Sequence, residues 1–120
     1  MPPTTVVIFK ESDGSCPLLE WLDTLPAKAR AKCIVRIERL KQAGHELRRP
    51  EADTLRDGIH ELSARMGHVN YRILYFFHGK TAVISHGLVK QRGVPTGEID
   101  RAVDRMLRFV RNPQAHTYEE

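Results

Sequence analysis

The sequence has few cysteines and no long apolar run, and these absences exclude several classes of protein. Cys16 and Cys33 are its only cysteines and show no CxxC pairing, so a reducing cytoplasm is expected rather than a disulfide framework. No run approaches the roughly 18 apolar residues of a membrane span, and we predict no membrane association. The N-terminal stretch has neither a basic region nor a long apolar region, so no secretory signal is expected.

Motifs of metal-dependent and nucleophilic enzymes are also missing. The six histidines have no zinc-type spacing, and there is no phosphate-cradling glycine motif and no GxSxG sequence. Cys33 falls on the apolar side of a predicted helix, which argues against a nucleophilic role. We therefore expect neither a metal ion nor a cofactor.

Acidic residues are absent from the middle of the chain. The net charge is +4 and the sequence pI is about 9.3, yet all fifteen Asp and Glu residues lie outside 63–97. That stretch carries cations and histidines only, namely Arg65, Arg72, Lys80, Lys90 and Arg92 with His68, His78 and His86. Such a single-sign field predicts a surface that meets phosphates, and a hairpin whose charges happen to be basic is the alternative.

The hydrophobic pattern predicts one α+β domain over residues 1–120. The expected elements are a strand over 5–10, a short helix ending near 25, a helix over 26–43, strands over 59–66, 69–77 and 81–89, and a helix over 97–110. Residues 45–57 are expected to form a loop, and the tail from Asn112 onward is expected to fray. This order favours a small antiparallel sheet with two N-terminal helices packed on one face and a C-terminal helix, the other face being open for a ligand.

Alternation within the predicted elements assigns their faces. In the strand over 59–66, the apolar residues Leu62, Ala64 and Met66 alternate with polar ones, so Arg65 is predicted to point away from the apolar face. The two long helices each show an apolar stripe, formed by Cys33, Ile34, Ile37 and Leu40 in one and by Ile99, Ala102, Val103, Met106 and Val110 in the other.

Four stretches resemble the RelE/HigB toxin superfamily, and most closely its phage-derived, HigB-like branch: LRDGIHELSAR, YRILYFFHGK, ISHGLVKQRG and PTGEIDRAVDRM. The resemblance covers about residues 6–109 and implies a microbial RNase-like RelE fold. It also implies the toxin of a type II toxin–antitoxin system, an endoribonuclease (mRNA interferase) that cleaves mRNA on the ribosome and inhibits translation. The implied partners are the ribosome, mRNA and a cognate antitoxin, commonly a helix-turn-helix protein through which operator DNA is bound.

The same superfamily leaves two other functions open. ParE-like members inhibit DNA gyrase and cleave no RNA, and a degenerate member would only bind its antitoxin. One departure from the pattern bears on this choice, because Ser63 stands where the first arginine of E-L-R-x-R is usual, while the second is present as Arg65. Some relatives also keep a catalytic Tyr or His in the C-terminal segment, where this chain has His116 and Tyr118 without a clear alignment.

Metal-free RNA cleavage drives the 2′-hydroxyl in line onto phosphorus, so charge on the pentacovalent phosphorane must be neutralised. By the resemblance, we assign Arg65 to the scissile phosphate, because its planar fork binds two oxygens at once. Lys90 is a candidate for phosphate steering or for the base. His86 is a candidate acid, with a structural hydrogen bond as the alternative. Contacts with RNA or the ribosome are expected from four further residues, Arg72, Arg92, Gln91 and Lys80.

Overall fold

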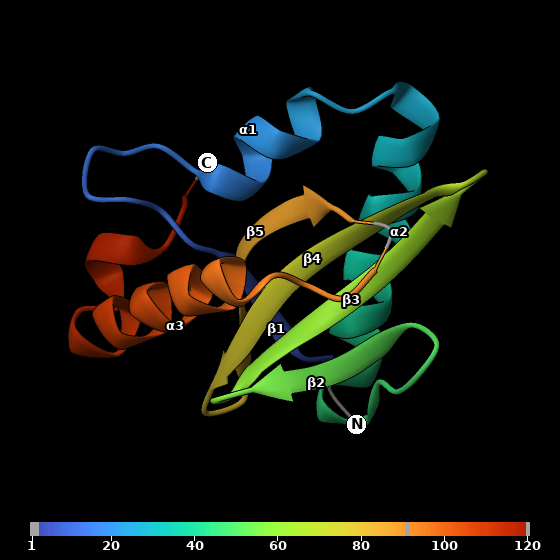
Figure 1. The fold of residues 1–120 in the computed structure, drawn as a ribbon. Coiled ribbons are helices and arrows are strands. Elements are labelled where there is room, and N and C mark those ends of the chain that lie inside the picture. The colour runs from blue at the N-terminus through green and yellow to red at the C-terminus, as the bar shows by residue number, and fades with distance from the viewer. Residues whose placement is uncertain (1–2, 91, 120) are drawn as a thin grey trace.

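Residues 3–90 and 92–119 are described by the structure, which is a computed structural model. Within them, helices, 3-10 turns and strands follow in this order (Figure 1): β1 (Thr5–Ile8), α1 (Pro17–Asp23), α2 (Ala27–Ala43), η1 (Gly44–Glu46), β2 (Ala52–Arg56), β3 (Ile59–Met66), β4 (Val69–His78), β5 (Thr81–Val89), α3 (Thr96–Arg111) and η2 (Gln114–His116). The predicted α+β class is confirmed, and the arrangement agrees with a RelE-like fold. No helix in the described ranges is long and apolar enough to cross a membrane.

The strands form one mixed sheet in the order β1-β5-β4-β3-β2. β2 to β5 are antiparallel to their neighbours, whereas β1 runs parallel to β5. The expectation of a purely antiparallel sheet is therefore wrong for β1. Because α1 and α2 follow β1, no hairpin links it to a neighbour, and the chain can return beside it in the same direction.

β2 lies within 45–57, for which the sequence predicts a loop, so that prediction is wrong for residues 52–56. β2 is a short, polar edge strand with a register shift between Thr54 and Arg56. Its ladder hydrogen bonds come from β3, and edge strands of this kind have little hydrophobic alternation of their own.

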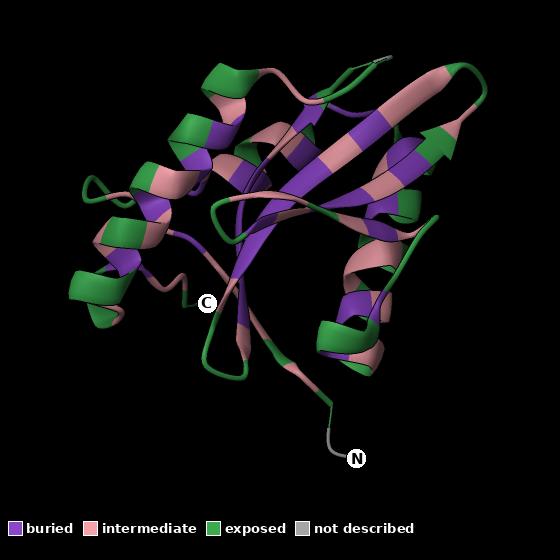
Figure 2. Ribbon diagram, turned by 60° about the horizontal axis from the view of Figure 1, so that its bottom comes forward, coloured by how far each residue is buried: buried purple, intermediate pink, exposed green. Residues whose placement is uncertain are grey.

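Each face of the sheet packs against helices. α1 and α2 cover one face, where Leu18, Cys33 and Leu40 meet Leu62 and Ile73. α3 lies against the opposite face (Figure 1), where its buried Ile99, Ala102 and Phe109 pack on Ile59, Leu74, Phe76 and Val83. Figure 2 shows the buried residues gathered in the central strands and on the helix sides that face them. The face expected to be open is therefore partly covered, because α3 carries enough apolar surface to bury against it.

Two members of the predicted helix stripes are exposed. Ile34 is 45% exposed and Val110 is 53% exposed, so both assignments are wrong, while Cys33, Leu40, Ile99 and Ala102 are buried. In α3 the inward line is Ile99, Ala102, Arg105 and Phe109, because the guanidinium of Arg105 finds polar partners beneath the helix. Periodicity alone assigns that inward position to an apolar residue instead.

The C-terminal segment is ordered by contacts with the start of the chain, so the prediction of a frayed tail is wrong up to Tyr118, whose backbone N–H donates to Ile8 O at 2.9 Å. His116 is buried, stacks on Phe9 with ring centroids 4.9 Å apart, and donates from Nδ1 to Lys10 O at 2.8 Å. Thr117 forms an antiparallel bridge with Phe9. The local sequence pattern does not predict these contacts, because Phe9 and Lys10 lie about a hundred residues before His116.

Candidate functional site

Arg65 and Lys90 lie close together at one end of the sheet. β3 and β5 are both antiparallel to β4, so they run in the same direction and finish at the same end of the sheet. Arg65 is the register partner of Asn70, and the Lys90 backbone N–H donates to Asn70 O at 3.1 Å. Two of the three predicted catalytic residues therefore lie on either side of β4, and both are exposed.

Arg65 and Lys90 carry positive charges that no described carboxylate neutralises by an ion pair. Arg65 Nε donates to Gly67 O at 3.0 Å, and Lys32 Nζ donates to Arg65 O at the same distance, which adds a third cation nearby. Among the described residues, no carboxylate forms an ion pair with Arg65 or Lys90. Uncompensated cations at an exposed edge raise the local concentration of anions such as phosphates.

Arg72 lies on the same sheet face as Arg65 but has an internal partner. Arg72 Nη1 donates to Glu61 Oε1 at 2.5 Å and to Ser63 Oγ at 3.3 Å. Burial raises the pKa of Glu61, against the opposing effect of Arg72. The charge of Arg72 is thus largely balanced by Glu61. An arginine in place of Ser63 would crowd Arg72, since the two residues are register partners. Glu61 was not among the predicted residues, although the alternation of β3 puts it on the face of Arg65.

His86 lies apart from this edge, beneath α3. Ser85 Oγ lies 2.7 Å from His86 Nδ1, and Arg105 Nη1 lies 3.0 Å from the same atom. Because a guanidinium can only donate, Nδ1 accepts and the proton resides on Nε2, which lies 3.5 Å from Glu98 Oε1. Burial, and then the charge of Arg105, lower the pKa of His86 to about 4. Lys90 is four positions further along the chain, about 13 Å at strand spacing.

The other predicted contacts are spread over the molecule. Arg92 is exposed in the connection from β5 to α3, two positions beyond Lys90, and Gln91 lies outside the described residues. Lys80 lies in the β4–β5 turn, at the opposite end of β5 from Lys90. Within the described ranges, no group of three or more His, Cys, Asp or Glu side chains could hold a metal ion.

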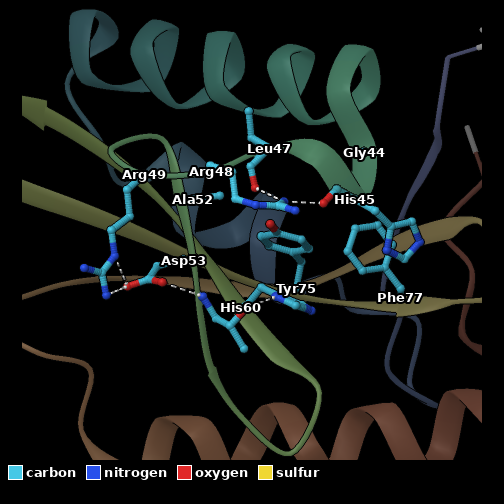
Figure 3. A pocket seen from close by; sticks show the side chains of 11 residues that line it. Gly44, His45, Leu47, Arg48, Arg49, Ala52, Asp53, His60, Tyr75 and Phe77 are labelled. Atoms are coloured by element: carbon cyan, nitrogen blue, oxygen red, sulfur yellow. Dashed lines mark hydrogen bonds and ion pairs between the residues drawn. The ribbon is translucent and has the colours of Figure 1, made fainter.

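The sequence interpretation also missed a cavity of about 590 Å³ at the β2 edge of the sheet (Figure 3). It lies on the α2 side, where His60 and Tyr75 face the core that α1 and α2 cover. His45 and the Arg48-Arg49 pair were visible signals, but they fall in the segment predicted to be a loop.

Comparison with known families gives one match. The profile of the family described as "Phage derived protein Gp49-like (DUF891)" matches residues 20–107, well over half of the chain. The matched range includes β2 to β5, and with them both Arg65 and Lys90. No curated protein is recognisably similar to the sequence.

Proposed function

The chain belongs to the phage-derived Gp49-like family, and from this membership we propose that it is the toxin of a type II toxin–antitoxin system. We further propose that it is a metal-independent endoribonuclease, an mRNA interferase of the RelE/HigB kind that cleaves mRNA on the ribosome. The family is a RelE-like one, and the α+β fold with its mixed sheet agrees with that relationship.

The observation that carries the proposal is the pair of exposed, uncompensated cations on either side of Asn70. The planar fork of Arg65 suits a scissile phosphate, because it can bind two oxygens at once. Lys90 adds a point charge from the neighbouring strand, which favours the phosphorane over the ground-state diester. Each well-placed donor contributes on the order of 3 kcal/mol to stabilising such a transition state.

Proton transfer is the weaker part of this site, which is why we propose dependence on the ribosome. The predicted acid His86 is neutral near pH 7 and lies under α3, and Glu61 is buried against Arg72. An enzyme that supplies charge but few proton-transfer groups gains when its target positions the RNA. We propose that the cognate antitoxin, a helix-turn-helix protein in the same cytoplasm, covers this basic edge and carries the contacts with operator DNA.

The proposal is tested by mapping cuts in an mRNA in a cell-free translation system with the wild type, Arg65→Gln and Arg111→Gln. Arg111 is exposed at the end of α3, so its substitution removes the same charge away from the site. We expect the wild type to cut the mRNA only during translation. The rate of cleavage should fall at least about a hundredfold in Arg65→Gln, because a donor to the phosphorane is removed, and should be unchanged in Arg111→Gln.

Two outcomes would contradict the proposal. If the folded wild type cuts no RNA but blocks supercoiling by DNA gyrase, the ParE-like alternative is correct. If it does neither and still binds an antitoxin, the protein is a non-catalytic member. Equal cutting by Arg65→Gln would remove Arg65 from the site and leave the activity itself in place.

A further inference from the structure

The cavity at the β2 edge has a lining of aromatic rings and cations (Figure 3). It lies between the η1 turn, the segment that leads into β2, and strands β2, β3 and β4, and its lining includes His45, Arg48, Arg49, His60, Tyr75 and Phe77. Cavities of this size commonly hold small ligands. We propose that it binds an aromatic base that carries a phosphate, either a free nucleoside monophosphate or one nucleotide of an RNA chain.

The rings in the cavity form two stacked pairs. His45 stacks on Phe77 with centroids 3.7 Å apart and planes 20° apart, and His60 stacks on Tyr75 at 5.2 Å and 25°. The edge of His60 also meets Phe77 at 5.4 Å, so the four rings form one continuous surface. His45 belongs to the exposed residues, so a flat aromatic ligand can add to its outer face. Stacking of a base on such rings tolerates any of the four bases.

Arg48 is the cation that remains available to an anion. Its Nη1 donates to His45 O at 2.5 Å and to Leu47 O at 3.2 Å, and these carbonyls hold the guanidinium in place (Figure 3). Nε and Nη2 take part in no hydrogen bond between described residues, nor does Arg48 join any ion pair among them. Arg49, in contrast, is paired with Asp53 at 2.8 Å. One fixed guanidinium with free N–H groups suits a phosphate.

The Tyr75 hydroxyl and the His60 imidazole supply hydrogen-bonding groups on the floor of the cavity. Burial raises the pKa of Tyr75 to about 12, so the hydroxyl beneath Arg48 keeps its proton and can donate (Figure 3). His60 Nδ1 lies 3.1 Å from Thr54 Oγ1, and burial followed by the charge of His45 lowers the pKa of His60, which favours the neutral ring. A neutral imidazole and a phenol can each pair with the polar edge of a base.

The cavity is separate from the edge that carries Arg65. His60 and Arg65 are five positions apart in β3, so their side chains point to opposite faces of the sheet. A ligand in the cavity therefore meets neither Arg65 nor Lys90. The inference does not rest on the proposed ribonuclease activity, and each can fail without the other.

The test is a titration of the ¹⁵N-labelled protein, followed by amide shifts, with AMP, GMP, CMP and UMP, with ribose 5-phosphate, and with inorganic phosphate. We expect the nucleotides to shift the amides of residues 44–54 and of Phe77 with a Kd of about 1 mM or tighter. Arg48→Gln should weaken binding at least about tenfold, because Arg48 is the arginine of the cavity lining that forms no ion pair with a described residue. Arg65→Gln and Arg111→Gln should leave binding unchanged. A short RNA that competes with AMP would identify the source as RNA, and failure to compete would identify free nucleotide.

Three results would overturn the inference. Binding of ribose 5-phosphate or phosphate as tight as that of the nucleotides would show an anion site without a base. Nucleotide binding lost in Arg65→Gln but kept in Arg48→Gln would locate the ligand at the other face. No shift of the cavity amides at about 10 mM nucleotide, a tenfold excess over the expected Kd, would show that the cavity binds none. His45→Ala, at an exposed residue, gives a second variant that tests stacking, and it should weaken the binding of all four nucleotides.

Discussion

Gly87 leaves room for Trp21, and filling that space should destabilise the protein strongly. A Cβ on Gly87 would overlap the Trp21 ring at Cε3 and Cζ3 and would lie 2.5 Å from Cδ2. Carbon atoms pack at about 3.5–4.0 Å, so the ring would have to retreat by at least about 1 Å. Trp21 is carried by α1, whose Leu18 and Leu22 are buried in the core, so the ring cannot retreat without disturbing them.

We expect Gly87→Ala to lower the free energy of unfolding by about 3 kcal/mol, the upper part of the range for overpacking a core. The backbone does not add to this, because Gly87 is not among the described residues with positive φ. The lowering of the melting temperature should be about 10 °C for a chain of this length. Trp21 is the single tryptophan, and the substitutions displace or remove it, so its fluorescence cannot report equally on every variant. Unfolding in urea is therefore followed by far-ultraviolet circular dichroism.

A double-mutant cycle with Trp21→Leu tests the reasoning. The smaller side chain vacates the space, so Gly87→Ala should cost less than about 1 kcal/mol in that background, a coupling of about 2 kcal/mol. If Gly87→Ala is equally destabilising with and without the indole ring, the clash is not the cause. A Gly87→Ala protein as stable as the wild type would refute the packing argument altogether.

Two further predictions concern ionisable groups. His86 should titrate near pH 4 by ¹H NMR. Because a histidine in the unfolded chain binds its proton from about pH 6.5, His86 should lower the free energy of unfolding by about 3 kcal/mol as the pH falls from 6.5 to 4. His86→Asn should remove this contribution. Glu11, whose pKa is lowered first by its hydrogen bond with Arg108, stabilises the fold above pH 4.5, and this contribution is lost as pH falls through its folded pKa. Glu11→Gln should therefore cost about 2 kcal/mol in urea unfolding at pH 7, against under about 0.5 for the exposed Asp104→Asn.

Local pattern predicted most of the fold. The meander of β3, β4 and β5 and the amphipathic helices follow from alternation and helical spacing, which are properties of neighbouring residues. β2 could not be found this way, because its strand conformation depends on β3. The parallel pairing of β1 with β5 and the docking of the tail on Phe9 depend on partners far along the chain, which no local pattern specifies.

The candidate site was predictable to the extent that it follows from the meander. Since β3 and β5 run in the same direction on either side of β4, residues at their ends, such as Arg65 and Lys90, must lie at one edge. The surroundings of His86 were not predictable, because its partner Arg105 comes from α3. The cavity was missed for the same reason, since the η1 turn and the edge of the sheet meet only in three dimensions.

The parallel pairing of β1 also constrains the order in which the molecule can assemble. The hairpins formed by β3, β4 and β5 close over short stretches of chain, but β1 needs Thr81–Ile84 as its partner, and Glu11 reaches Arg105 and Arg108 across more than ninety positions. Contacts of such long range are slow to form. Because these partners lie seventy or more positions further along the chain, the residues around β1 leave the ribosome before the segments that bind them have been made. β1, the first strand of the sheet to be made, can pair only after β5 has been made.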